Sequence, residues 1–296
     1  MTQAREATVP QPNAPLVGPL WSAWLYLRSI SVDLAHRIIK RRRRVRTQVL
    51  SDYDAGEWAQ QAHARDWLRA ETLVDYVDRA WSRRELVCLI DDKLRRMPAR
   101  DYYRLKRGRI GDVMRRFAGD TDTLVELGSG TGTNLFGLAL DGQWSSLIGL
   151  ELSKTGQEVG EAVARHFRLT DRIGFGEIDL VNPRSPGYAT LKGRTVFTHY
   201  CLEQLPDDTE AVFRHLCAAG IRRAIHLEPS FELLSSVSLR DLASMSYVWR
   251  QDYQRTMVRC ARRLEAEGKI RIVAVERLSF ASSLRNPPTL LVWEPI

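Results

Sequence analysis

The hydrophobic pattern of the chain changes its period near residue 120, and this change limits the fold more than any other feature. Beyond that point, short apolar runs alternate with helical stretches. The runs lie at residues 123–127, 146–150, 173–178, 195–198 and 224–227, and the helical stretches lie at 132–141, 154–168, 207–218 and 239–267. Strands that alternate with helices form a parallel sheet with helices on both faces. We therefore predict an α/β core over residues 120–296.

Two further apolar runs, at 270–275 and 289–293, have no helix between them. The turn-forming triplet Asn286-Pro287-Pro288 joins them, so they should pair as an antiparallel hairpin at the sheet edge. The expected sheet is thus seven-stranded and mostly parallel, with an antiparallel terminal strand.

The segment before residue 120 has a different character. Residues 1–15 are polar and contain proline, which predicts a flexible tail. Apolar residues at helical spacing predict helices near 16–39, 55–70, 70–97 and 101–118. Many aromatic residues occur here, and we interpret residues 16–119 as a helical lid that also binds substrate.

Composition narrows the class of protein. The chain has 44 basic and 36 acidic residues, a net charge of +8, which favours anionic partners. Lys40–Arg44 is the one dense basic run, so nucleic acid is not the expected partner. No apolar run is long enough for a membrane span, and no secretory signal is evident, which predicts a cytoplasmic protein. The four cysteines are far apart, so neither a metal site nor a disulfide framework is expected.

A glycine-rich loop follows the first strand of the core, with the sequence ELGSGTGTN at 126–134. Glycine allows a sharp turn and leaves no Cβ between the main chain and a ligand. The free N–H groups of the next helix face the same place. The dinucleotide fingerprint G-x-G-x-x-G is not met, because Thr133 occupies its last glycine position. The loop also has no cation, which disfavours a polyphosphate ligand.

Acidic residues stand at the ends of the next two strands. Glu151 ends the second strand, where a carboxylate can accept hydrogen bonds from both ribose hydroxyls. Asp179 follows the third strand and can accept a hydrogen bond from an adenine amino group. Together with the loop, these two acids predict a nucleoside-binding site.

The loop and the ordered acids resemble the first three motifs of class I S-adenosylmethionine-dependent methyltransferases, and the terminal hairpin resembles the end of their sheet. The resemblance covers residues 120–296 and implies a Rossmann-like fold with S-adenosylmethionine as cofactor. In such enzymes the loop holds the methionine moiety, the first strand-end acid the ribose, and the second the adenine. The implied cofactor-binding residues are Glu126, Gly128, Ser129, Gly130, Gly132, Asn134, Glu151, Leu152, Asp179, Leu180, His199 and Tyr103.

Candidate catalytic residues follow the fourth and fifth strands. They are His199, Tyr200, Glu203, His226 and Glu228. Ligands bind beyond the carboxyl ends of parallel strands, so we expect these side chains in one cleft. A neutral histidine can act as the base at pH 7, while the glutamates can orient a substrate amine or a histidine. The alternatives are that a histidine packs on the cofactor and that Tyr200 only stacks.

The resemblance extends to bacterial natural-product methyltransferases, including enzymes that act on indole rings, through residues 203–206, 226–229 and 286–295. We therefore expect methyl transfer to a small aromatic or indole-type secondary metabolite, with the acceptor atom left open. By analogy, the helical part can mediate a homodimer. Two alternatives stay open: an RNA methyltransferase that uses residues 40–44, and a membrane-surface or scaffold protein that uses the apolar face of residues 21–27 with the same basic run.

Overall fold

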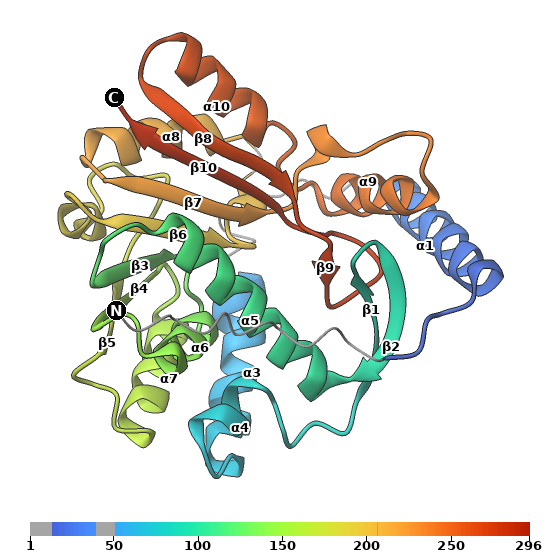
Figure 1. Cartoon of the computed structure of the whole chain (residues 1–296), viewed down its shortest axis with the longest axis horizontal. Helices are drawn as coiled ribbons and strands as arrows, with labels where there is room; N and C mark the ends of the chain where they lie inside the picture. The colour runs from blue at the N-terminus through green and yellow to red at the C-terminus, as the bar shows by residue number, and fades with distance from the viewer. Residues whose placement is uncertain (1–13, 40–50, 206) are drawn as a thin grey trace, which may run out of the picture.

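The computed structural model describes residues 14–39, 51–205 and 207–296, so most of the predicted tail and the basic run Lys40–Arg44 lie outside the described residues. A seven-stranded sheet with the order β5-β4-β3-β6-β7-β10-β8 forms the centre of the molecule (Figure 1). Neighbouring strands from β5 to β7 are parallel, and β10 is antiparallel to both of its neighbours. The predicted α/β fold with an antiparallel terminal strand is confirmed. The strands are β3 (Thr123–Leu127), β4 (Ser146–Glu151), β5 (Ile173–Glu177), β6 (Thr195–His199), β7 (Arg223–Glu228), β8 (Ile270–Arg277) and β10 (Thr289–Pro295).

Helices cover both faces of this sheet. One core cluster joins the sheet to α5 (Ala99–Phe117), α6 (Thr133–Asp141) and α7 (Lys154–His166). The second joins it to α8 (Thr209–Ala218) and α10 (Met257–Ala266). Alternate side chains of β3 show why both faces are apolar: Leu124 belongs to the first cluster and Val125 to the second.

The prediction of a helix near 70–97 is wrong over most of that range. A short helix, α4 (Leu73–Val77), is followed by the hairpin β1 (Glu85–Ile90) and β2 (Lys93–Pro98). Alternate residues of β1 belong to different clusters, with Leu86, Cys88 and Ile90 in the first cluster and Leu89 in another, which is the period of a strand. The connecting residues Asp91 and Asp92 both have positive φ, as a two-residue hairpin turn requires.

The helix predicted over 239–267 is in fact two helices, α9 (Leu239–Gln251) and α10. Asp252 adopts a left-handed conformation with φ of 55°, and this ends α9. The link between β8 and β10 is also more than a turn, because it contains β9 (Phe280–Ala281), which pairs with β1. Thus the hairpin of the N-terminal segment and the terminal hairpin of the core share a small three-stranded sheet.

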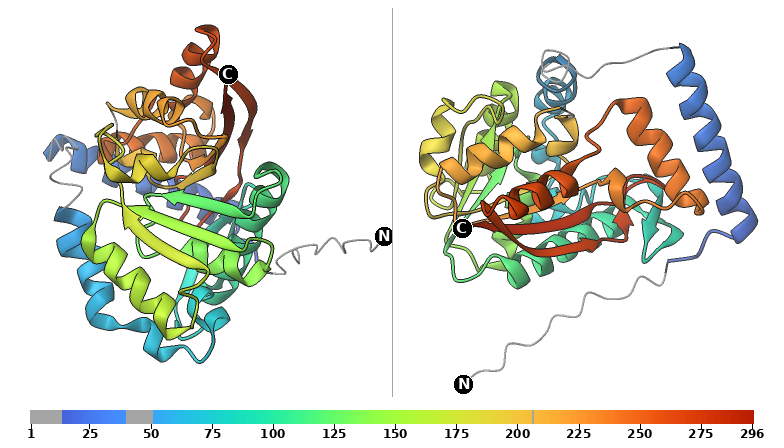
Figure 2. Two further views of the ribbon diagram at one scale, coloured as in Figure 1. Left: turned by 90° about the vertical axis from the view of Figure 1, so that its left-hand side faces the viewer. Right: turned by 90° about the horizontal axis from the view of Figure 1, so that it is seen from above.

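The segment 16–119 lies in separate places on the core. Its first helix, α1 (Pro19–Ile39), packs against α9, at one side of the molecule in Figures 1 and 2. The turns η1 (Tyr53–Glu57) and α3 (Trp58–Ala64) instead pack against α7, and η2 (Asp66–Arg69) precedes α4. Within the described ranges, no helix combines the length and apolarity that a bilayer crossing demands.

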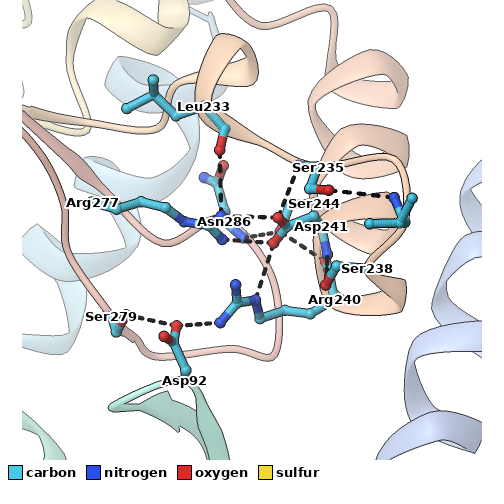
Figure 3. A network of polar contacts seen from close by, with 11 residues as sticks. Asp92, Leu233, Ser235, Ser238, Arg240, Asp241, Ser244, Arg277, Ser279 and Asn286 are labelled. Atoms are coloured by element: carbon cyan, nitrogen blue, oxygen red, sulfur yellow. Dashed lines mark hydrogen bonds and ion pairs between the residues drawn. The ribbon is translucent and has the colours of Figure 1, made fainter.

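A buried carboxylate, Asp241 of α9, lies at the centre of a polar network between α9, the end of β8 and the β1–β2 turn (Figure 3). It accepts two hydrogen bonds from the guanidinium of Arg277, at 2.6 and 2.9 Å, and one from Arg240. Arg240 also contacts Asp92 in the β1–β2 turn, which in turn accepts a hydrogen bond from Ser279. The network therefore fixes the start of the β8–β10 link against α9 and the hairpin, next to Asn286.

Candidate functional site

A cavity of about 360 Å³ opens at the carboxyl ends of the strands. It lies where β3 and β6 meet, which is the point at which the strand order reverses direction and where doubly wound folds bind ligands. The side chains around it come from the ends of β3, β4 and β6, from α5 and from the N-terminal segment. They include Trp58, Tyr103, Lys106, Glu126, Glu151, Asp179, His199, Tyr200 and Glu203.

The glycine loop forms the floor of this cavity. Gly128 and Gly130 have φ of 68° and 53°, values that side chains rarely tolerate. A Cβ at Gly128 would lie 2.1 Å from Cys201 Sγ, and one at Gly130 would lie 2.7 Å from Trp58. Ser129 also lines the cavity. Gly132 does not, because it caps α6 and faces Phe175, so its role is packing.

Only one of the two carboxylate oxygens of Glu126 has a hydrogen-bond partner in the described residues. Its Oε1 accepts a hydrogen bond of 2.6 Å from Asn134 Nδ2. Its Oε2 is buried and has no hydrogen-bond partner in the described part of the chain. Burial raises the pKa of Glu126 to about 8. A carboxylate oxygen in such a place is a site for a cationic donor.

Lys106 of α5 is the cation that sequence reasoning missed. It lines the same cavity, and desolvation lowers its pKa to about 8, while the charge of Glu126 acts in the opposite direction. Lys106 lies one helical turn after Tyr103, which also lines the cavity. That i, i+3 spacing places both side chains on one face of α5. The spacing was the feature of the sequence from which Lys106 could have been predicted. The cavity thus presents an acid and a base for a zwitterionic group.

The strand-end acids both reach the cavity. Glu151 accepts hydrogen bonds from the N–H of Gly130 at 2.7 Å and of Ser153 at 2.9 Å, and its desolvation raises its pKa. A carboxylate has about four acceptor positions, so it can accept further hydrogen bonds from a ligand. Asp179 is held by its own N–H, which donates to Ser185 Oγ at 2.9 Å. Leu152 and Leu180 line the cavity beside these acids.

The N-terminal segment closes the cavity through η1 and α3. Trp58 lies against Gly130, and Tyr53 packs beside it with ring centres 5.5 Å apart. Asp54 accepts a hydrogen bond of 2.5 Å from Ser153 Oγ and one of 3.1 Å from the Thr155 N–H, and these bonds lower its pKa. Asp54 therefore fastens the cover to the N-terminus of α7. This contact could not be predicted from the sequence, because about 100 residues separate the partners.

His199 and Tyr200 border the other half of the cavity, directly after β6. Desolvation holds the pKa of His199 well below its usual value, so the imidazole is neutral. Its Nε2 is buried without a hydrogen-bond partner in the described residues. The Tyr200 ring packs edge-on against it with centroids 4.5 Å apart. This half of the cavity offers a neutral nitrogen beside an aromatic face.

Asn286, predicted only as part of a turn, supports this half of the cavity. It is buried, with φ of 67°, a conformation that asparagine tolerates better than most residues. Its carbonyl oxygen accepts a hydrogen bond of 2.8 Å from the Tyr200 hydroxyl. Its amide Nδ2 donates to Glu203 Oε2 at 3.0 Å. Asn286 thereby holds two cavity residues in place from behind.

His226 and Glu228 do not line the cavity, contrary to the expectation of one cleft. His226 is aligned with Thr198, one residue before His199, and so points to the other face of the sheet. There it contacts Thr198 Oγ1 and accepts a hydrogen bond from Trp293, each at 3.0 Å. Complete burial lowers its pKa to about 3.

Glu228 lies beneath the loop that follows β6. It accepts hydrogen bonds from the N–H groups of Cys201, at 2.9 Å, and of Glu203, at 3.3 Å. Its pKa is raised to about 7 by burial, which these bonds partly offset. Glu228 is thus a positioning residue for the turn that carries Tyr200 and Glu203. Of the five candidates, His199, Tyr200 and Glu203 come together at the cavity.

Comparison with solved structures gives the class of fold. An O-methyltransferase family protein from Burkholderia thailandensis matches 93% of this chain and 72% of its own, with a TM-score of 0.53 and 15% identity. A geranyl diphosphate methyltransferase, solved with GPP and sinefungin, matches 67% of this chain and 81% of its own, with a TM-score of 0.50 and 14% identity. No protein-family model and no curated protein sequence matches the chain. The likeness shows that the chain has the fold of class I methyltransferases.

Proposed function

We propose that this protein is an S-adenosylmethionine-dependent methyltransferase that acts on a small aromatic or indole-type acceptor. The observation that carries the proposal is the buried, unpartnered Oε2 of Glu126 above the glycine loop, in a cavity at the switch point of a methyltransferase fold. The proposal also draws on the two solved neighbours, one of which was solved with the cofactor analogue sinefungin.

The residues of the first half of the cavity fit the cofactor's groups. Glu126 and Asn134 suit the amino group of the methionine moiety, and Lys106 suits its carboxylate. Glu151 suits the ribose hydroxyls, since its carboxylate keeps acceptor capacity beyond its two backbone bonds. Asp179 and Leu180 suit the adenine, and Trp58 covers the loop. When bound, the cofactor supplies a methyl group on a positively charged sulfur.

The second half of the cavity suits a planar acceptor. Tyr103 and Tyr200 provide aromatic surface, and Glu203 provides a carboxylate near them. His199 is neutral and has its Nε2 without a partner, so in the tautomer with Nε2 unprotonated it can take a proton from an O–H or N–H acceptor. For an electron-rich carbon the same nitrogen takes the ring proton. Holding the acceptor in line supplies much of the rate enhancement.

Incubation with isotopically labelled S-adenosylmethionine and a panel of indoles, phenols and amines, read by mass spectrometry, tests the proposal. Label in one of these acceptors supports it. Label in bulk RNA alone would establish the RNA methyltransferase alternative instead. Failure of calorimetry to detect binding of S-adenosylmethionine or S-adenosylhomocysteine would refute the proposal.

All four cysteines are free, which fits the cytoplasmic location that we propose.

Variants then separate the roles of the residues. His199→Gln should lower kcat by about 10²–10⁴-fold for an O–H or N–H acceptor. Asn286→Ala should raise KM and lower kcat, because it removes the side-chain hydrogen bond that holds Glu203 while leaving the cofactor residues in place. The exposed His166→Gln on α7 is the matched control and should keep wild-type rates. A His199→Gln enzyme with full activity would remove His199 from the mechanism.

A further inference from the structure

The helix α1 turns an apolar face to solvent. Leu20, Leu27 and Ile38 are 87%, 52% and 81% exposed, at positions that fall on one stripe of a helix. Further exposed apolar side chains widen this stripe; they are Trp21, Trp24, Val32, Leu34 and Ile39. A contiguous exposed apolar surface of this kind marks a site of interaction. We call these eight residues the α1 stripe.

The side of α1 that faces the protein is held by apolar contacts of Leu25, Tyr26 and Ile30 and by a buried carboxylate. Asp33 is buried there and accepts hydrogen bonds from Ser246 at 3.1 Å, Arg250 at 2.8 Å and Arg285 at 2.5 Å. Tyr26 is buried beside it. These contacts to α9 and the β8–β10 link fix which side of α1 faces outwards. The orientation of the α1 stripe is therefore built into the fold.

Apart from Asp33, the charged side chains of α1 are positive. Asp33 is the sole acid of α1, and its arginine partners already neutralise it. Arg28 lies 5.5 Å from the Trp24 ring, at the stripe itself. In the sequence, the five basic residues Lys40–Arg44 follow directly after the helix. The stripe is thus an apolar surface of leucine, isoleucine and tryptophan that borders Arg28, and a strongly basic run follows it in the sequence.

Of the partners that such a surface can have, an anionic lipid bilayer fits both properties. Apolar side chains enter the headgroup boundary, tryptophan favours that depth, and arginines attract anionic lipids. In a symmetric pair of α1 helices no free acid of either helix would face the arginines of the other. RNA would contact the arginines but leave the stripe exposed. We propose that α1 lies flat on an anionic membrane surface, with the stripe inserted and the arginines of α1 near the headgroups.

The position of α1 suits this arrangement. It lies at the outer edge of the molecule in the right-hand view of Figure 2, with its flank on α9 and no other element beyond it. Trp249 of α9 is also exposed beside it, with Arg37 at 5.5 Å from its ring. The helix is not apolar enough to cross the bilayer. It can therefore bind at the surface while the cavity remains part of the folded core.

Co-sedimentation with phosphatidylcholine vesicles, with and without phosphatidylserine, tests this proposal on the full chain. We expect binding to the serine-containing vesicles, with a blue shift of tryptophan emission, and loss of binding at high salt. Replacing Arg41, Arg42, Arg43 and Arg44 with Gln should weaken binding by about fivefold per charge. Trp24→Ser combined with Leu27→Ser should abolish it.

Leu68→Ser is the matched control, because Leu68 is as exposed as Leu27 but lies in η2. It should bind vesicles as the wild type does. All variants should keep the wild-type melting temperature and methyltransferase activity on a soluble acceptor. Absence of binding to the anionic vesicles would overturn the proposal. So would a dimer in light scattering that the Trp24/Leu27 variant dissociates, or RNA binding that depends on the four arginines while vesicle binding does not.

Discussion

Binding of S-adenosylhomocysteine should release a proton from Glu126, and the amount can be worked out from the site. The pKa of Glu126 is raised to about 8 by burial, so at pH 7 the carboxyl is about 0.9 protonated. The ligand's ammonium, placed against Oε2, requires the ionised form, and that proton must leave. Lys106, with its pKa lowered to about 8, and the ligand amine each take up about 0.1 proton. The net release is about 0.7 proton.

Calorimetric titration at pH 7 in phosphate and in Tris measures this number, because the two buffers differ in ionisation enthalpy. Glu126→Gln should abolish the release and leave a small uptake, with weaker affinity. Glu158→Gln, an exposed carboxylate on α7, should behave as the wild type. A wild-type enthalpy that is the same in both buffers would refute the reasoning about Glu126. No heat of binding at all would refute the proposed function instead.

Three further predictions concern stability and the cover. Asp241→Ala should lower the free energy of unfolding by about 2–3 kcal/mol in urea denaturation, because it removes the buried partner of two half-buried arginines, Arg240 and Arg277. Since the folded pKa of Asp241 is lowered to about 2 from 3.8, its contribution should be complete above pH 4 and disappear as the pH falls toward 2. Trp293→Phe should cost about 1–3 kcal/mol by leaving His226 Nε2 without its donor, with ligand affinity unchanged. Asp54→Ala should raise the Kd of S-adenosylhomocysteine about tenfold, since it removes charged hydrogen bonds that hold the cover; unchanged affinity would contradict this.

The parallel core could be predicted because short continuous apolar runs alternate with stretches of helical spacing. The β1–β2 hairpin could not, because Val77, Trp81 and Leu86 continue an apolar spacing that suits a helix. The strand β1 begins only at Glu85 and is six residues long, which is too short to interrupt the helical pattern clearly. The helices α9 and α10 were predicted as one helix for a similar reason, since only a five-residue link that begins at the left-handed Asp252 separates them.

The cofactor side of the cavity was readable because strand order alone brings the loop and the acids to one edge. Asp54 and Asn286 were not readable, since their contacts depend on how distant segments pack. His226 shows that a position near the end of a strand does not by itself place a side chain in the cavity. When both faces of a sheet are buried, the pattern does not tell which face a side chain takes, and a register offset of one residue moves it away from the site.

The place of β10 has a consequence for how the protein is made. β10 lies between β7 and β8 but follows both in the sequence, so these two strands have no partner for their facing edges until residue 295 has left the ribosome. During that interval the edge of β7 is open, and the surface that Trp293 later covers, around Phe213, is bare. Open strand edges on a nascent chain invite pairing with other chains. The pairing of β8 and β10 with the other five strands must therefore wait until this segment has been translated, and it is at this stage that a chaperone would be needed most.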